Sequence, residues 1–244
     1  MEKQTLLRLG MPPGAAIYAS KFKEKLAAHV DALGAANATK LFHHGENGPI
    51  AAMPGLRFVG AKNWVGILAD SDNQPLLFEF MGAAVKVATE LAGRPVPVNV
   101  EEHKLDLKPL QYPKTYWIRE MALKRRHPKA RNADINDLVL ERLTKSIERQ
   151  CARYGIECPT AEQLEISVDV TRDLGMPLTT TTGVTKEYVT LANASFTIHA
   201  ELTGFWFAGN LTSRGYGRIG VDLAQLSSKS HGGNANEITR RVAG

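Results

Sequence analysis

The first 107 residues alternate between extended and helical segments, and this order constrains the fold more than any other feature. A strand is predicted at Thr5–Leu9, and apolar spacing predicts a helix at Ile17–Leu33 that ends at Gly34. A hairpin, a helix and an extended segment follow at Leu56–Phe80 (with its turn at Asp70–Asn73), Met81–Leu91 and Val96–Leu107. Strand, helix, two strands, helix and strand is the order of the split βαβ, ferredoxin-like fold.

In the rest of the chain, the sequence predicts helices first and strands afterwards. The segment Tyr116–Arg126 is predicted to be helical, and a second helix begins near Asn132–Asn136 and ends at Tyr154, before Gly155. Strands are expected at Leu164–Val170, where apolar and polar residues alternate, at Tyr188–Leu202 and at Ile219–Leu226.

These elements predict an α+β protein of four parts. Residues 1–111 form a ferredoxin-like domain, 112–158 an arginine-rich helical insertion, and 159–226 a second, β-rich domain that contains a glycine-rich loop. Residues 227–244 form a polar tail. No apolar run reaches membrane-spanning length and the amino terminus is not a secretory signal, so a cytoplasmic location is expected.

Positive charge is concentrated between Lys114 and Arg153. This segment holds four lysines and seven arginines against five acidic residues, a net charge of +6, whereas the whole chain carries +5. The second predicted helix places four basic residues on one face: Arg142, Lys145, Arg149 and Arg153. A polyanion-binding element is therefore predicted. For the helix alone, a solvated face with pairs such as Glu141–Lys145 is the alternative.

A glycine-rich stretch, Gly209–Gly220, follows the apolar run Phe205–Ala208. It holds four glycines, and Arg214 and Arg218 bracket its Gly-Tyr-Gly centre. Glycine permits left-handed backbone and close approach, so such a turn can present amides and guanidinium groups to phosphate oxygens. A sharp loop between two strands would use the same glycines.

Two adjacent histidines, His43 and His44, are the best candidates for proton transfer. Histidine titrates near neutral pH and can take a proton from a hydroxyl without a metal. Tyr18, early in the first predicted helix, is expected near them; surface histidines in a polar loop are the alternative. Trp117 could pack in a core or stack on a base. The chain lacks the common metal, nucleotide and serine-hydrolase motifs, so no cofactor and no metal site are predicted.

The run from Gly204 to Ile219, which includes Ser213-Arg214-Gly215-Tyr216-Gly217-Arg218, resembles the glycine-rich loop of the RAMP superfamily of CRISPR proteins. The class it resembles most is the repeat-RNA endoribonucleases that mature guide RNA. The basic segment Tyr116–Arg153 is similar to the arginine-rich helical element of the type I-F and type IV subtypes, with type IV preferred. In those subtypes, this element lies in the distorted major groove of a repeat stem-loop.

The resemblance implies a metal-independent endoribonuclease that binds the CRISPR repeat stem-loop and cleaves it by 2′-OH attack. It also implies retention of the mature crRNA together with other subunits of an effector complex. His44, His43 and Tyr18 are the implied catalytic candidates. The RNA-binding candidates are Arg119, Lys124, Arg125, Arg126, Lys129, Arg131, Arg142, Lys145, Arg149, Arg153, Arg214, Gly215, Gly217, Arg218, Arg240 and Arg241. A non-catalytic RAMP subunit that holds crRNA is the alternative, and a basic protein–protein adaptor is a third.

Overall fold

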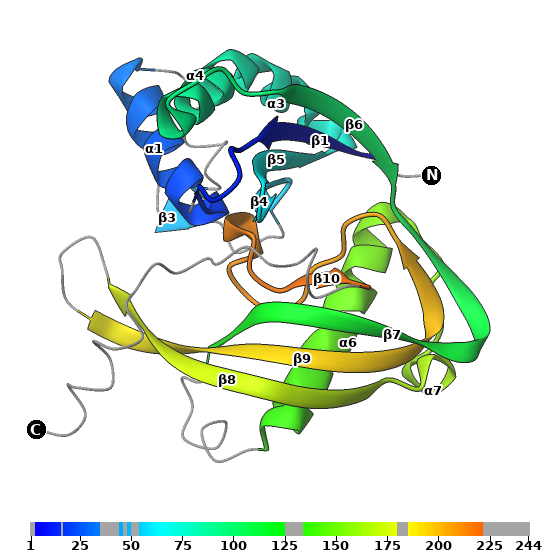
Figure 1. Cartoon of the computed structure of the whole chain (residues 1–244). Helices are drawn as coiled ribbons and strands as arrows, with labels where there is room; N and C mark the ends of the chain where they lie inside the picture. The colour runs from blue at the N-terminus through cyan, green and yellow to red at the C-terminus, as the bar shows by residue number, and fades with distance from the viewer. Residues whose placement is uncertain are drawn as a thin grey trace, which may run out of the picture.

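A computed structural model describes residues 3–15, 17–34, 44–45, 48–49, 54–124, 134–179 and 185–221. Two four-stranded antiparallel sheets dominate the described part of the chain, and a helical layer packs against each sheet (Figure 1). The α+β class and the ferredoxin-like first half predicted from the sequence are confirmed. No described helix is long and apolar enough to cross a membrane.

The first sheet has the strand order β4-β5-β1-β6. Its strands are β1 (Lys3–Gly10), β4 (Leu56–Ala61), β5 (Trp64–Asp70) and β6 (Val98–Lys104). The helices α1 (Ala19–Ala32), α3 (Gln74–Glu79) and α4 (Met81–Ala92) connect them. The order is that of a ferredoxin-like sheet, because β1 lies between the third and fourth strands of the unit.

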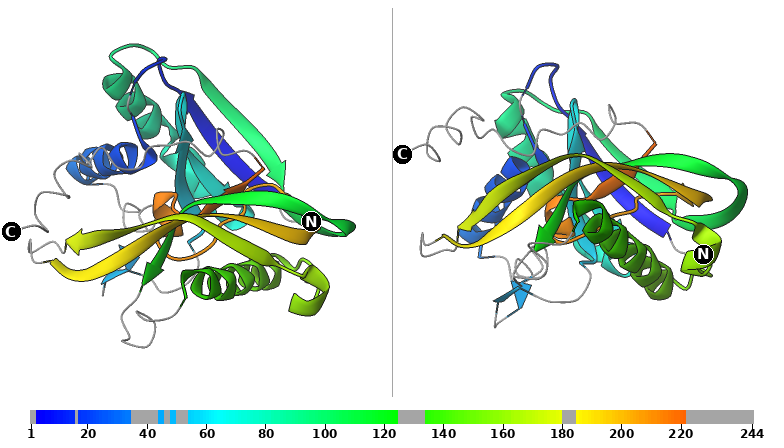
Figure 2. Two further views of the ribbon diagram at one scale, coloured as in Figure 1. Left: turned by 60° about the horizontal axis from the view of Figure 1, so that its bottom comes forward. Right: turned by 90° about the horizontal axis from the view of Figure 1, so that it is seen from below.

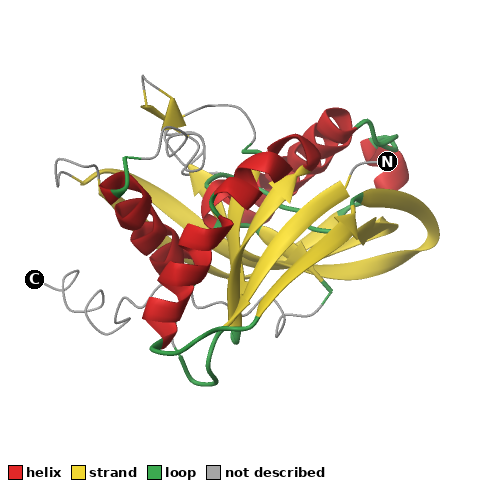
Figure 3. Ribbon diagram, turned by 90° about the horizontal axis from the view of Figure 1, so that it is seen from above, coloured by secondary structure: helices red, strands yellow, loops and turns green. Residues whose placement is uncertain are grey.

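The helices of this unit cover one face of the first sheet, as the view from above shows (Figure 3). Phe22, Leu26 and Val30 recur on one face of α1 and are fully buried against Leu7, Leu9 and other strand residues. Gly34 has a φ of +63°, which suits the turn that ends this helix.

The predicted hairpin exists, but its turn was misplaced. β4 and β5 pair from Leu56↔Ala69 to Ala61↔Trp64, so the chain reverses at residues 62–63. The polar run that the sequence suggested as the turn instead forms a 3₁₀ helix, η1 (Ser71–Asn73), which leads into α3. Asp and Asn favour helix entry as well as turns, so composition alone could not separate the two.

The second sheet has the order β10-β7-β9-β8. Its strands are β7 (Asp106–Lys124), β8 (Ser167–Thr179), β9 (Thr185–Thr203) and β10 (Arg218–Gly220). The predicted strand at residues 188–202 lies within β9, and the one at 164–170 is confirmed only from Ser167, because Leu164 ends the short helix α7. The helix α6 (Ile135–Tyr154) lies along this sheet in both views of Figure 2. The short α7 (Ala161–Leu164) and η2 (Thr212–Arg214) complete the described elements, apart from the two-residue strands β2 (His44–Gly45) and β3 (Gly48–Pro49).

The helix predicted at Tyr116–Arg126 is wrong, because residues 116–124 belong to strand β7. Tyr116 and Ile118 are buried against the α6 side, and Trp117 between them faces the other way. Irregular pairing between Ile118 and Met121 interrupts the alternation, so the strand period is hard to see in the sequence.

The second predicted helix is confirmed as α6, which ends at Gly155 in the left-handed conformation. Val139, Leu143, Ile147 and Cys151 bury its apolar face against the second sheet. Most of the described residues in the range 112–158 belong to β7 or to α6. Helix α6 follows the first strand of the second sheet. The domain boundaries stay predictions.

Candidate nucleic-acid interface

The glycine-rich loop passes between the two sheets and is fastened to both units. Gln4 in β1 donates to the Phe205 carbonyl at 3.1 Å and accepts from the Phe205 N–H at 2.8 Å. Gln150 in α6 makes the same two-way contact with Phe207, at 2.8 and 3.1 Å. Both glutamines are buried, so these bonds satisfy amides that would otherwise be costly. They fix where the loop begins.

Three glycines of this loop allow backbone segments to approach closely. A Cβ on Gly217 would lie 1.8 Å from the Ala208 carbonyl oxygen, and one on Gly215 would lie 2.4 Å from that of Phe58. One on Gly209 would lie 2.8 Å from the Met121 side chain. All three residues have positive φ angles.

The amides of these glycines also have partners within the protein. The N–H groups of Gly215 and Gly217 donate to the backbone carbonyl oxygens of Thr212 and Arg119. The N–H of Gly209 donates to the Ser146 hydroxyl. The amides of these three glycines therefore serve the fold.

The start of α1 meets this loop at Lys23 and Arg214. Burial, and then the charge of Arg214, lowers the pKa of Lys23 to about 8. The Lys23 ammonium also lies 5.4 Å from the ring centre of Phe58. Tyr18 caps the same end of α1, and its neighbour Ala19 lies beside the position that a Gly215 side chain would take. Lys23 and Arg214 therefore meet at one junction, at the end of α1 where Tyr18 is the N-cap residue.

A second ionisable group lies where β7 bulges. Glu120 has a φ of +51°, and its N–H donates to the Asn193 side chain at 2.8 Å. Burial raises the pKa of the Glu120 carboxyl, while Arg119 and Arg172 oppose that rise. Burial, and then the charge of Glu120, raises the pKa of Tyr216 to about 12. The left-handed backbone of a non-glycine residue is a strained feature of the kind that gathers at functional sites.

The basic residues of α6 do not share one environment. Arg142 is half-buried and Arg149 is exposed, whereas Lys145 forms an ion pair with Glu141. Arg153 lies 3.0 Å from Asp70, which is buried at the end of β5. That ion pair links α6 to the first unit. The sequence could not show this structural role of Arg153, because Asp70 is far from it in the chain.

Asp70 is the centre of a buried network between the two units. It pairs with the Arg57 guanidinium at 3.0 Å and accepts a hydrogen bond from the Tyr154 hydroxyl at 2.7 Å. Arg57 and Asp70 are each only 1% exposed. Burial of two charges carries a desolvation penalty, which only their mutual attraction and their hydrogen bonds can offset. The network therefore holds α6 against the first sheet.

Several predicted site residues lie outside the described residues. They are His43, Arg125, Arg126, Lys129, Arg131, Arg240 and Arg241, together with the side chains of His44 and Lys124. The backbone of His44 pairs with Pro49 between β2 and β3. Within the described residues, no group of His, Cys, Asp and Glu side chains could hold a metal ion.

Sequence reasoning missed Lys23, Glu120 and Tyr216 as members of this region. Lys23 is one of three lysines in a helix whose buried face was recognised, and nothing local separates it from Lys21 or Lys25. Glu120 could be noticed only as an acid within a basic stretch. The contacts that bring these residues together span both halves of the chain.

Comparisons with known proteins agree with the fold. The family model for the type IV CRISPR-associated endonuclease Csf5 matches residues 1–223. The chain is 34% identical to the solved structure described as Csf5, the CRISPR-Cas type IV Cas6 crRNA endonuclease, with a TM-score of 0.77. The alignment covers 90% of this chain and 99% of that one.

Two crystal structures of Cas6b share the fold at 13% and 12% identity, with TM-scores of 0.59 and 0.51. Each alignment covers 90% of this chain, and 99% and 98% of the Cas6b chains. No curated protein matches the chain. The resemblance to the RAMP nucleases, with type IV preferred, is confirmed. The chain belongs to the family of type IV CRISPR-associated endonucleases, Csf5.

Proposed function

We propose that the chain is a metal-independent endoribonuclease that binds the stem-loop of a CRISPR repeat RNA and cuts at the base of the stem. The observation that carries this proposal is the meeting of Lys23 and Arg214 where α1 reaches the glycine-rich loop, at the end of α1 where Tyr18 is the N-cap residue. Membership of an endonuclease family supports a cutting reaction. The name of the relative at 34% identity, a crRNA endonuclease, supports RNA as the substrate.

The chemistry needs a base, an acid and a cation. The 2′-oxygen attacks the adjacent phosphorus and the bond to the 5′-oxygen breaks, which yields a 2′,3′-cyclic phosphate (or a 3′-phosphate) and a 5′-hydroxyl. His44 is assigned to proton transfer, with His43 and Tyr18 as the alternatives. Arg214 stays charged and suits the developing phosphorane charge. Lys23, with its pKa of about 8, can donate a proton near neutral pH.

The basic segment is assigned to the stem. Arg142 and Arg149 present cations from α6, and the segment from Lys124 to Arg131 adds five more basic residues. The major groove of an RNA duplex is deep and narrow, so a basic element fits where a hairpin end opens it. The bound product would then remain on the protein with other subunits of an effector complex.

Cleavage of end-labelled repeat RNA in EDTA tests the proposal. We expect the wild-type protein to cut the RNA at one position, and the products to carry a cyclic phosphate or 3′-phosphate and a 5′-hydroxyl. Replacement of the scissile 2′-OH by hydrogen should abolish cutting and preserve binding. Tight binding of RNA that stays intact would overturn the enzymatic proposal in favour of a crRNA scaffold.

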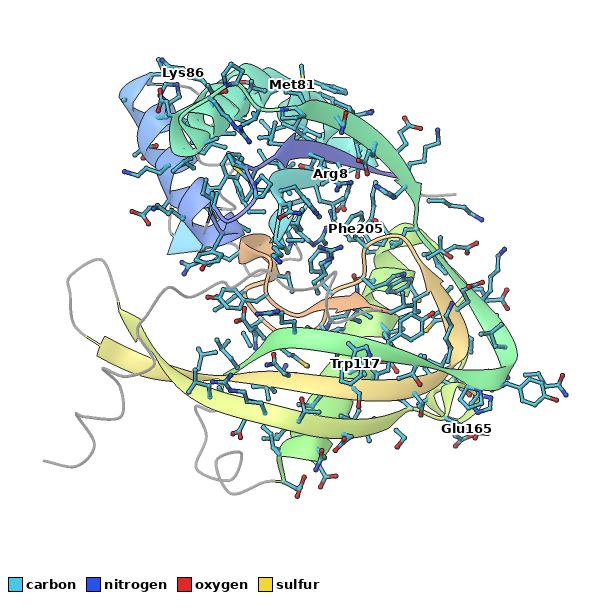
Figure 4. The ribbon with its side chains drawn as sticks, viewed as in Figure 1. Arg8, Met81, Lys86, Trp117, Glu165 and Phe205 are labelled. Carbon is cyan, nitrogen blue, oxygen red and sulfur yellow. The ribbon has the colours of Figure 1, made fainter. Side chains whose placement is uncertain are left out.

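Variants separate the assigned roles. Lys23→Ala, His44→Ala and Tyr18→Phe are each expected to slow cleavage by roughly 10²- to 10⁴-fold if the residue transfers a proton. Lys86→Ala is the matched control, because Lys86 is an exposed lysine on the outer face of α4 (Figure 4). If Lys23→Ala cuts as fast as Lys86→Ala, Lys23 has no part in the reaction.

A further inference from the structure

Among the described elements, no helix covers the face of the second sheet opposite α6, and Trp117 lies on that face. Tyr116 and Ile118 are buried on the α6 side, so Trp117 and Arg119 point to the opposite side. Across the sheet, Trp117 is paired with Gly220 on β10 and with Ser195 on β9. Both directly paired residues are small, and the Trp117 side chain is half-buried.

Two arginines of the same face lack partners for part of their guanidinium groups. Arg119 and Arg218 are directly paired between β7 and β10, so both side chains leave the sheet on one side. Arg119 Nε and Arg218 Nη1 are buried with no hydrogen-bond partner among the described residues. Arg57 Nε also lacks a partner, but Asp70 matches the charge of Arg57. Arg119 and Arg218 form no ion pair with a carboxylate of the described residues, so two unmet donors on these adjacent cations point to a missing anionic acceptor.

Two buried aromatic rings, Trp64 and Phe205, lie against the inner side of this site. The Arg218 guanidinium carbon lies 4.8 Å from the ring centre of Phe205 and 5.5 Å from that of Trp64, and Arg8 lies 5.2 Å from the same Trp64 ring. Figure 4 shows Arg8, Phe205 and Trp117 following one another from β1 to β7. Burial, and then the charge of Arg8, lowers the pKa of Arg218 to about 10, so an anion here would relieve repulsion.

We propose that Trp117, Arg119 and Arg218 form a binding site for single-stranded RNA that adjoins the repeat stem, with a base stacked on Trp117 and a phosphate bound by the two arginines. This inference rests on the proposed function. Cationic groups that alternate with exposed aromatic faces are the usual platform for unpaired nucleotides. A duplex could not offer its base faces to the indole ring.

The site adjoins the proposed cutting site along the chain. Arg214 and Arg218 are four residues apart, on either side of Tyr216, which packs on Ala122, Val189 and Leu191. An RNA strand that leaves the Lys23–Arg214 junction would therefore reach β10 directly. Carboxylates near this path, Glu101 beside Arg8 and Glu120 beside Arg119, disfavour additional phosphates and so limit how many the site can hold.

Binding of five RNAs measures the site directly. They are the hairpin alone, the hairpin with a 5′ flank, the hairpin with a 3′ flank, and the two flanks as free oligonucleotides. One flank should raise the affinity of wild-type protein for the hairpin roughly tenfold, as expected for one stacked base with a phosphate contact. The two flanked hairpins distinguish which strand occupies the site.

Trp117→Thr should remove the affinity that the flank adds, and Trp117→Phe should retain most of it because a ring remains. Thr suits a β-strand, and an unchanged circular dichroism spectrum and melting temperature confirm that the variant is folded. Arg119→Gln should reduce the salt dependence of flank binding by about one phosphate contact. Binding of a flank should quench tryptophan fluorescence in the wild type and not in Trp117→Phe.

The outcomes separate this inference from the proposed function. If neither flank adds affinity, or if Trp117→Thr keeps the full flank contribution, the site is refuted even when the hairpin is cut normally. If a free flank binds in a Trp117-dependent way while the hairpin is never cut, the site is supported and the nuclease proposal fails.

Discussion

The two sheets bury different numbers of faces. Every residue of β4 and β5 is buried, because α1 and α4 cover one face of the first sheet, and Phe205 and Phe207 cover the other. In β9, buried residues alternate with partly exposed ones from Ala192 to Ala200, and α6 covers only one face. Strands β4 and β5 of the first sheet are therefore interior, although β6 at its edge is mostly exposed. In the part of the chain that the structure describes, one face of the second sheet stays partly exposed and can meet a ligand.

The charges on the two sheets follow the same division. In the first sheet, Arg57 is buried together with Asp70 and Tyr154, and its charge is matched. One nitrogen of each of the three arginines lacks a hydrogen-bond partner among the described residues: Nε of Arg57, Nε of Arg119 and Nη1 of Arg218. The counter-charge differs, because Arg57 forms an ion pair with Asp70 and no carboxylate of the described residues forms one with Arg119 or Arg218. A buried arginine with a matched charge stabilises the fold, whereas an arginine without a counter-charge is available for an anion. Substitutions made separately in the two regions test this difference.

The largest effect on stability is expected for Asp70→Asn. The change leaves Arg57 buried without a counter-charge and removes the acceptor for Arg153, and breaking such a pair costs about 3–5 kcal/mol. Urea unfolding followed by circular dichroism measures the loss. Glu141→Gln is the matched control, since it breaks the exposed Glu141–Lys145 pair for a few tenths of a kcal/mol. Equal losses for the two variants would show that the network is not buried in solution.

Gly217→Ala should destabilise the protein by about 2–3 kcal/mol. The left-handed backbone costs roughly 1–2 kcal/mol for a residue with a Cβ, and the new carbon would also meet the Ala208 carbonyl oxygen at 1.8 Å. Gly93→Ala isolates the first term, because Gly93 has a φ of +66° and nothing within 4 Å of the added carbon. Thermal unfolding of the two variants should differ; if they melt together, the loop does not pack between the units as described.

Much of the fold could be predicted because the pattern of burial is local. The period of α1, the helix of α6 and its end at Gly155 follow from apolar spacing and a glycine stop. Strand β7 could not be predicted, because its irregular pairing with β9 interrupts the alternation of apolar and polar residues. The strand is stabilised by pairing with distant segments, and a local sequence pattern does not reveal that pairing. Local propensity gives no information about which strand a segment will pair with.

The site was predictable in part for a related reason. The glycine-rich loop and its arginines are visible as a motif, but the sequence could not show that Gln4 and Gln150 fix the loop, or that Arg153 belongs to a buried network. Each of these contacts joins residues far apart in the chain. Composition identifies basic residues, and only burial separates those that bind a partner from those that hold the fold.

Lys23→Met should change how stability depends on pH. The pKa of Lys23 is lowered from 10.5 to about 8 in the folded protein, first by burial. Between those values the unfolded chain binds more protons, so wild-type stability should rise with pH from about 8 to 10.5. Below pH 8, the variant should be more stable than wild type by on the order of 1 kcal/mol, after allowance for partial screening.

Unfolding midpoints measured from pH 7 to 10 test this linkage. The difference between Lys23→Met and wild type should shrink as pH rises, because the wild-type lysine loses its charge in the folded state. Lys86→Met, at an exposed position, should follow the wild-type curve throughout. A constant difference across this range would mean that Lys23 is not held near Arg214.

The smallest effect on stability is expected for Arg149→Ala, and it sharpens the comparison on α6 itself. Arg149 is exposed, so its loss should change the unfolding free energy by less than about 0.5 kcal/mol. If it binds the stem, the same variant should weaken RNA binding and lower the salt dependence by about one phosphate contact. Arg153→Ala, four residues further along the helix, should instead lose stability, because its ion pair with the buried Asp70 joins the two units. Stability and salt-dependent RNA affinity, measured on both variants, therefore distinguish an arginine that binds RNA from one that stabilises the fold. Identical behaviour of the two variants would contradict that distinction.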